Sequence, residues 1–434
     1  MLENKKTTYL IVLAVFIIAL LARLLVAFYS PEVVVYDIDR YNELALNILE
    51  GRGFTLDGRP STFHEPFYSY FLAAVYYLFG YSYTLARVIQ CVIGSVICIL
   101  IFFISKRLFN LKIAVISASI ACLNPGFIKS VKYLMTENIF TLLFLISIFF
   151  IIKYTEKRDL KDLIFSGVAL GVATLTRSAV FLFPFFIVLL LLKRKPPLVC
   201  SIRRNILSAI IFMLCFILPI IPWTLRNWRV YHRFIPICTK GGLAFYISYI
   251  PKDGKLYGFI TNDSTTEKSK LLGSELEQSN FLFKETLKFI KNNPRRILKL
   301  EVLKAAYFWS PFDWEILGCG VYNFMYGFVF PFFIYGIIVA FKRFRELLPV
   351  YLPIIYSFLF ALVTYGSPRF RLPVEPYIII IASAGIAYFL TRFSKRIYGI
   401  LLTGVYLLLN LFLYFYSYQV RLIARSIFEK AHLW

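Results

Sequence analysis

The chain has 434 residues, of which 59% are hydrophobic and 18% aromatic, and its formal net charge is +24. Apolar runs such as YLIVLAVFIIALLARLLVAFY recur from end to end and reach the about 20 residues that cross a bilayer, which excludes a soluble globular protein. Nucleic acid is not the expected partner of the positive charge, because Lys and Arg lie in short clusters between the apolar runs, as the positive-inside rule expects. The expected partner is membrane lipid.

The apolar segments predict spanning helices in chain order. Lys5 and Lys6 precede a first apolar run that is too long for the core of a signal peptide, so we expect an uncleaved first helix. The predicted spans are 9–29, 85–104, 111–127, 138–153, 162–176, 179–193, 206–223, 321–341, 348–364, 374–391 and 397–416.

The short apolar segment PFYSYFLAAVYYLFG (66–80) decides on which side every later loop lies. If it spanned, the later Lys and Arg clusters would lie outside, against the positive-inside rule. We therefore predict an interfacial or re-entrant helix there. The fold class is then an all-α polytopic membrane protein with about 11–13 transmembrane helices and external loops that carry interfacial helices.

Two long segments, about 30–84 and 224–320, are predicted to lie outside. In the second, SELEQSNFLFKETLKFIKNN predicts a helix that Pro294 closes, and RRILKLEVLKAAYFW predicts an amphipathic helix at the bilayer surface. We divide the chain into an N-terminal transmembrane module (1–223), an external loop region (224–320), and C-terminal transmembrane helices with a short tail (321–434). The sequence has no Gly-rich phosphate loop and no nucleotide-binding βαβ pattern, which argues against a nucleotide-sugar or ATP site.

The first external segment is acidic, and its stretch DRYNELALNILEG predicts a short helix that Leu44, Ile48 and Leu49 would dock on the membrane. Two interpretations stay open: a solvated outer loop, or carboxylates of which one acts as a general base. The acids of this segment are Glu32, Asp37, Asp39, Glu43, Glu50, Asp57 and Glu65.

Glu137 and several arginines lie at the same predicted face. Glu137 is either an acid favoured by the dipole of its helix or a second acid of the same site. Arg177, Arg369 and Arg371 oppose the positive-inside trend, so a bound phosphate is one explanation and snorkelling or a lipid headgroup contact is the other. Arg226 lies just outside a predicted span.

A metal site has weak support in the sequence. The seven Cys show no CxxC spacing, and no HExxH motif is present. His64, Glu65 and His232 are the candidate ligands if a divalent metal binds, but a lone His is more often a polar surface group. No cofactor is assigned, and a divalent metal stays open.

Several motifs together carry a family resemblance that runs from about residue 9 to about residue 390. The sequence resembles the GT-C glycosyltransferases, and within them the protein O-mannosyltransferase and aminoarabinose transferase branch, which is glycosyltransferase family 39-like. That resemblance implies inverting transfer of a hexosyl or pentosyl group from a polyprenyl-phosphate donor to a protein, lipid or glycan at the external face of the cell membrane. The motifs are YDIDRYNELALNILEGRGF, STFHEPFYSYFLAAVYYLFG, LNPGFIKSVKYLMTENIF, TLTR, PWTLRNW and RFRLPVEPY.

The resemblance also implies roles for single residues. Asp37 matches the aspartate that would act as base, and Glu137 matches the family's acid in the TE position. The family's second acid is Ile38 here, with Asp39 one place later, and HEPF stands where the family often has Pro-Pro. We predict catalytic roles for Asp37, Asp39 and Glu137, donor phosphate binding by Arg177, Arg369 and Arg371, and substrate binding by Tyr41, Glu65 and Arg226.

Two other functions compete with this prediction. A transporter or flippase of lipid-linked sugars would place ionisable residues near the midplane on broken helices, often within repeats. Here Arg23 is the main charge within a predicted span, and the other candidates lie in loops, so an enzyme fits better. A glycan polymerase or ligase that uses the same lipid pool is the alternative among enzymes.

Overall fold

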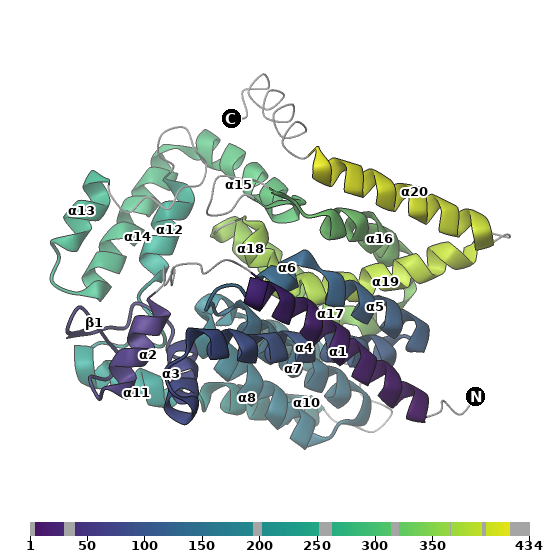
Figure 1. Ribbon diagram of the computed structural model, residues 1–434. Coiled ribbons are helices and arrows are strands. Elements are labelled where there is room, and N and C mark those ends of the chain that lie inside the picture. Colours follow the sequence, from purple (N-terminus) through teal and green to yellow (C-terminus); the bar gives the residue numbers. More distant parts are fainter. Residues whose placement is uncertain are drawn as a thin grey trace.

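The computed structural model describes residues 5–29, 40–193, 202–250, 263–313, 321–364, 366–392 and 396–416. Asp37 and Asp39 therefore lie outside the described residues. Figure 1 shows a bundle of helices with a layer of shorter elements, α2, α3, β1 and α11 to α14, at its left end. The bundle helices are α1 (Lys5–Tyr29), α4 (Tyr83–Leu108), α5 (Leu111–Leu123), α7 (Glu137–Lys157), α8 (Leu160–Thr176), α9 (Phe183–Lys193), α10 (Ile202–Ile217), α16 (Phe324–Ala340), α17 (Phe344–Val363), α19 (Glu375–Arg392) and α20 (Arg396–Phe415).

The shorter elements follow the loops of the bundle. The layer at its end contains α2 (Tyr41–Leu49), β1 (Thr55–Leu56), β2 (Arg59–Pro60), α3 (Phe67–Phe79), α11 (Ile221–Tyr231), α12 (Gly241–Tyr249), α13 (Ser264–Lys270) and α14 (Glu275–Asn292). The connecting elements are α6 (Pro125–Lys129), η1 (Ser178–Val180), α15 (Pro294–Trp309), β3 (Phe312–Asp313), β4 (Val321–Tyr322), η2 (Phe341–Arg343), α18 (Pro368–Arg371) and η3 (Leu372–Val374).

The chain is an all-α integral membrane protein, as the sequence predicts. Among the described residues, five helical stretches are long and apolar enough to cross a membrane: Lys5–Tyr29, Tyr83–Leu108, Glu137–Lys157, Phe324–Val363 and Pro368–Arg392. The stretch Phe324–Val363 contains two of the predicted spans, α16 and α17, with η2 between them. The other predicted spans are also helical for most of their length, several of them as shorter or divided helices, so the number of spans remains a prediction.

Three predicted spans are divided between two elements: 111–127 covers α5 and α6, 179–193 covers η1 and α9, and 206–223 covers α10 and α11. The segment 206–223 was expected to be continuous, but α10 ends at Ile217 and α11 starts at Ile221, with a bend of 50° between them. Pro219 and Pro222 explain the break, because neither can donate a backbone hydrogen bond and each clashes with the preceding turn.

The helices and the hairpin begin and end where local chemistry favours it. Ser82 and Asn110 cap α4 and α5 by accepting backbone hydrogen bonds from Leu85 and Ile113. The strands β1 and β2 are joined by Asp57 and Gly58, both at positive φ, as a two-residue hairpin loop requires.

The predicted helix α2 is confirmed, but its docking differs from the prediction. Gly51 and Gly53 follow it at positive φ. Leu44 is fully buried in the helical core rather than directed at the membrane, because α2 packs on α3 and the bundle.

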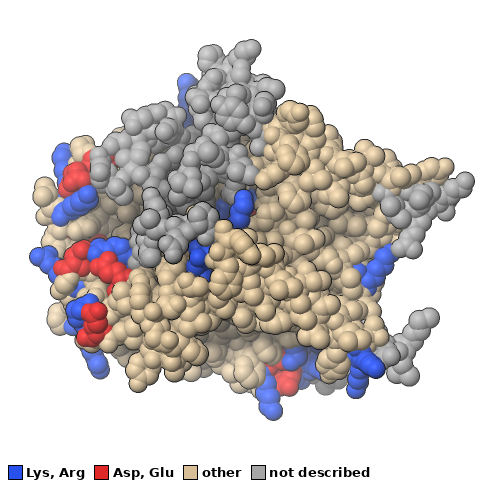
Figure 2. All heavy atoms as spheres, in the orientation of Figure 1, with Lys and Arg blue, Asp and Glu red and all other residues tan. Residues whose placement is uncertain are grey.

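The loops that the charge rule assigns to one side do lie at one end of the bundle. Arg107 pairs with Glu156 at 2.5 Å, Lys106 donates to Thr8, and Arg343 donates to the carbonyl of Leu108. Figure 2 shows charged side chains mainly over the short elements on the left and at the lower right, with a few Lys or Arg side chains in the middle beside the grey residues. This distribution is the one expected for a helical bundle in a bilayer.

Candidate functional site

At the end of the bundle that carries the short layer, two arginines share one carboxylate. Arg369 Nε lies 2.7 Å from Glu137 Oε1, and Arg177 Nη1 lies 3.3 Å from the same oxygen. Glu137 is the first residue of α7, and Arg177 immediately follows α8, so the bundle fixes both backbones. The ring of Phe370 lies 5.2 Å from the Arg177 guanidinium. We call Glu137, Arg177 and Arg369 the shared-carboxylate cluster.

The shared-carboxylate cluster places two guanidiniums around one carboxylate and, within the part of the chain that the structure describes, leaves two buried polar atoms without a hydrogen bond. Two guanidiniums face one carboxylate, and the arginine side chains are 14% and 16% exposed while that of Glu137 is 4% exposed. Among the described residues, Glu137 Oε2 and Arg177 Nη1 are buried and have no hydrogen-bond partner. Such groups are costly in a closed core, and the guanidinium nitrogen suits a place where an anion binds.

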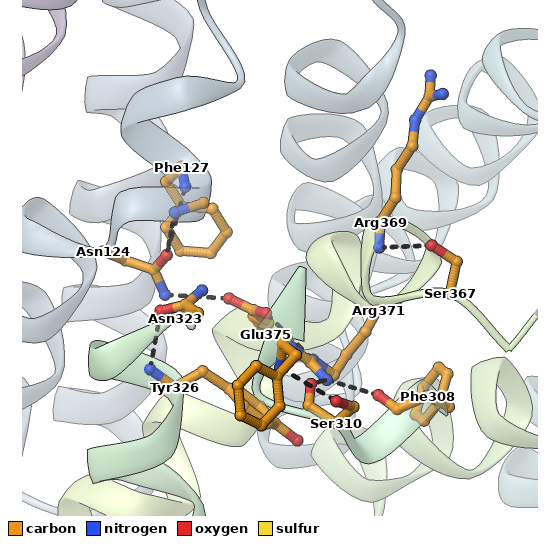
Figure 3. A network of polar contacts seen from close by, with 12 residues as sticks. Asn124, Phe127, Phe308, Ser310, Asn323, Tyr326, Ser367, Arg369, Arg371 and Glu375 are labelled. Atoms are coloured by element: carbon orange, nitrogen blue, oxygen red, sulfur yellow. Dashed lines mark hydrogen bonds and ion pairs between the residues drawn. The ribbon is translucent and has the colours of Figure 1, made fainter. Parts of the chain in front are cut away.

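Arg371 belongs to a second, separate cluster (Figure 3). Its Nε lies 3.1 Å from Glu375 Oε1, and its Nη1 donates to the carbonyls of Phe308 and Ser310 at 2.6 and 2.8 Å. Asn124 donates to the other Glu375 oxygen at 3.0 Å, and the Tyr326 ring lies 3.4 Å from the guanidinium.

The side chain of Arg371 is 1% exposed, and Figure 3 shows the Arg369 side chain directed away from this cluster. Of the three arginines predicted for the donor phosphate, Arg371 therefore has the contacts of a structural residue. We call Arg371, Glu375 and Asn124 the saturated cluster.

Glu65 is buried and binds the protein rather than facing an open cleft. Its Oε1 accepts hydrogen bonds from Ser178 N at 2.9 Å and from Ser178 Oγ at 2.6 Å. Burial would raise the pKa of Glu65, but Lys240 and the two Ser178 donors hold the pKa below its usual value. The carboxylate is therefore ionised at neutral pH.

The remaining predicted residues lie around the same layer. Tyr41 is buried, with its ring 5.2 Å from those of His64 and Tyr68. Arg226 Nη1 and Nη2 donate to the carbonyls of Ser61 and Phe54 at 2.8 and 3.0 Å, so its guanidinium holds the first loop.

Several acids of the first segment have arginine partners. Arg40 pairs with both Glu43 and Asp57 at 2.6 Å, and Arg52 pairs with Glu50. These acids are paired with arginines on the protein surface. For this part of the segment, the contacts therefore favour the interpretation of a solvated outer loop.

The candidate metal ligands do not form a metal centre in the described part of the chain. His232 ends α11, and the Glu65 carboxylate is bound to Ser178. Among the described residues there is no group of three or more His, Cys, Asp or Glu side chains that could hold a metal ion.

Sequence reasoning missed the residues that hold the site in place. Glu275 at the start of α14 accepts hydrogen bonds from Ser61 Oγ at 2.7 Å and Thr62 N at 2.8 Å, and nothing local in the sequence signals these contacts. Glu375 could have been found, because it follows Arg371 by four residues, a spacing at which helical side chains pair.

Comparisons with known proteins support the fold. Residues 62–223 match the family model described as dolichyl-phosphate-mannose-protein mannosyltransferase. A search of curated proteins found no match to the chain.

Solved structures align with a larger part of the chain than the family model does. The archaeal oligosaccharyltransferase AglB from Archaeoglobus fulgidus, in complex with an inhibitory peptide and a dolichol-phosphate, aligns with a TM-score of 0.56 at 14% identity, over 94% of this chain and 55% of that chain. The oligosaccharyltransferase of the same organism, tethered with an acceptor peptide, aligns with a TM-score of 0.55 at 16% identity, over 88% and 50%. ArnT from Cupriavidus metallidurans, bound to undecaprenyl phosphate, aligns with a lower TM-score of 0.40 at 12% identity, over 90% of this chain and 82% of that chain.

The chain shares its fold with these archaeal oligosaccharyltransferases, and its helical membrane architecture confirms the predicted all-α polytopic fold class. The chain spans about half the length of the archaeal oligosaccharyltransferases that it matches.

Proposed function

We propose that this chain is a membrane glycosyltransferase that takes a sugar from a polyprenyl-phosphate donor. The observation that carries the proposal is the shared-carboxylate cluster, in which the guanidiniums of Arg177 and Arg369 converge on Glu137. A phosphate that gains charge as it leaves is stabilised by guanidiniums held in place beforehand. The family description and the bound dolichol-phosphate of AglB name donors and ligands of this chemical class.

The proposed reaction displaces the phosphate with inversion at the sugar. The acceptor hydroxyl or amine gives its proton to Asp37 and forms the new bond to the anomeric carbon. The bond from that carbon to the phosphate oxygen breaks, and polyprenyl phosphate leaves with the electron pair. Glu137 orients the two arginines, and Asp39 supports Asp37.

Asp37 is proposed as the base because of its place in the chain. Its segment joins the end of α1 at Tyr29 to the start of α2 at Tyr41. The helix α2 packs against α3 in the layer at the end of the bundle. Tyr41, Glu65 and Arg226 shape this layer. The Lys and Arg clusters at the other end of the bundle favour an external location of the site.

The test is donor turnover by the purified protein. A panel of polyprenyl-phosphate hexoses and pentoses is incubated with acceptors, and release of polyprenyl phosphate is followed by mass spectrometry. We expect one donor class to be consumed, and Asp37→Asn to lower turnover about 10³-fold, because a general base contributes about 10²–10⁴-fold.

Glu50→Gln is the matched control, since Glu50 lies in the same segment and pairs with Arg52 on the surface. It should keep wild-type turnover. Near-normal turnover by Asp37→Asn would rule out Asp37 as the base, and consumption of no donor would favour transport of lipid-linked sugars. Products that lengthen with time would favour a glycan polymerase.

A further inference from the structure

Arg177 occupies a break between two helices, where its direction depends on one backbone position. It is the single residue between α8 and η1, and its backbone is extended, with φ −148° and ψ 113°. Ser178 then opens η1, and the first amides of a helix have no acceptor within it. An acceptor from elsewhere in the chain must therefore fix this turn.

Glu65 supplies that acceptor. One carboxylate oxygen receives both the backbone N–H and the hydroxyl of Ser178, so the turn is held at two points. Both bonds are charge-assisted, because the carboxylate is ionised, and such bonds are stronger than neutral ones. The Cys238 thiol donates to the same hydroxyl at 3.5 Å.

Glu65 is itself held by the layer of short elements at the end of the bundle. The backbone of Thr62 donates to Glu275 and accepts from Thr239 N at 2.9 Å. The carbonyl of Ser61 accepts from Arg226. Pro66 follows Glu65 directly and starts the turn into α3. The segment that carries the Glu65 carboxylate is thus held by contacts with α11, with α14 and with Thr239, which lies just before α12.

We propose that Glu65 is a positioning residue for donor binding: it fixes the turn at Ser178 and so aims Arg177 at the donor phosphate, without contacting the donor itself. This inference rests on the proposed function. It differs from the roles in substrate or metal binding predicted from the sequence, because both hydrogen bonds of this carboxylate oxygen go to Ser178.

A double-mutant cycle on ligand binding tests the inference. A short-chain polyprenyl phosphate is titrated into the detergent-solubilised protein, and its affinity is measured from the thermal shift. We expect Arg177→Ala to weaken binding about 10- to 100-fold and Glu65→Ala about 10-fold, as loss of a charge-assisted hydrogen bond or of its alignment would do. The double variant should be no weaker than Arg177→Ala, because Glu65 acts through Arg177.

Conservative variants separate positioning from a general loss of structure. Glu65→Gln keeps an acceptor oxygen and should retain most of the affinity, whereas Glu65→Ala should not. Glu50→Gln, an exposed acid of the same segment, should bind as the wild type does. With an active donor, Glu65→Ala should raise the KM for the donor while leaving the KM for the acceptor unchanged.

The outcomes distinguish this inference from the proposed function. Suppose that the wild type binds the lipid phosphate and that Arg177→Ala weakens binding. If the double variant then binds more weakly than Arg177→Ala by the full factor seen in Glu65→Ala, Glu65 acts independently of Arg177 and the inference is wrong. Wild-type affinity in Glu65→Ala would overturn it in the same way. If the wild type does not bind the lipid phosphate, the proposed function fails and the inference falls with it.

Discussion

Arg369 and Arg371 lie two positions apart in the sequence SPRFRLPVEPY and have opposite environments. Arg369 shares Glu137 with Arg177 and is partly exposed. Arg371 is buried and has its own carboxylate, Glu375, together with two backbone carbonyls. The sequence motif does not distinguish the two arginines. Their contacts differ, so we expect different roles for them.

The short helix α18 (Pro368–Arg371) explains the difference. Side chains two apart on a helix point to different faces, so Arg369 faces the start of α7 and Arg371 faces α15, α16 and α19. The shared-carboxylate cluster pairs two arginines with one carboxylate, and the saturated cluster pairs one arginine with one carboxylate. An incoming anion would therefore be attracted to the first cluster, whereas the second has its charges and hydrogen bonds already matched.

Removing each arginine should give the largest contrast between the clusters. Arg371→Ala leaves Glu375 buried without its counter-charge, and we expect a loss of about 3–5 kcal/mol in stability. Arg369→Ala leaves Arg177 beside Glu137, so its loss should be much smaller. Thermal unfolding of both variants in the same detergent measures the difference. Equal melting temperatures would show that the two clusters do not differ in this way.

Lys304 extends the comparison to a buried cation that can lose its proton. Its side chain in α15 is fully buried, with Nζ 3.1 Å from Glu301 and 2.8 Å from the carbonyl of Leu362. Burial lowers the pKa of Lys304 from 10.5 to about 8. The unfolded chain therefore binds more protons than the folded protein between about pH 8 and pH 10.5, and stability should rise with pH in that window.

Between pH 8 and pH 10.5, titration of Lys304 should raise the free energy of unfolding by at most about 3 kcal/mol. Thermal unfolding of the wild type and of Lys304→Met at pH 7 and pH 10 isolates the effect, since other titrating groups are common to both proteins. The wild type should gain stability relative to the variant as the pH rises. Parallel pH profiles would exclude an unprotonated Lys304 in this window.

Most helices could be predicted from the sequence because they depend on local patterns. Apolar runs marked the bundle helices, and α2, α14 and α15 followed from short amphipathic or capped stretches. Glu137, Arg177 and Arg369 were each identified as candidates on one face, and the structure brings them together. Their proposed roles, and those of Asp37 and Asp39, stay predictions.

The contacts that separate these candidates could not be predicted, because they join distant parts of the chain. Glu65 and Ser178 are 113 residues apart, and Arg369 and Glu137 are 232 apart. Which of Arg369 and Arg371 is buried depends on how α18 packs among α15, α17 and η3. The break at Ile217 was a local feature, however, and Pro219 with Pro222 was the signal that should have divided the span.

Neutralising Glu137 or Glu375 should give the smallest difference between the two clusters, and the one most specific to ligand binding. In Glu137→Gln the two arginines lose the anion that competes with a ligand, so a short-chain polyprenyl phosphate should bind about 10-fold more tightly at low salt. The gain should shrink as salt rises, because the arginines are partly exposed and screened.

Glu375→Gln is the matched control, since it removes the same charge from the saturated cluster. It should lower the melting temperature and leave the affinity unchanged, because Arg371 is held by the carbonyls of Phe308 and Ser310 and is closed off from the ligand. Affinity that rises equally in both variants would mean that only the net charge of this end of the bundle matters. Tighter binding in Glu137→Gln alone would place the anion at Arg177 and Arg369.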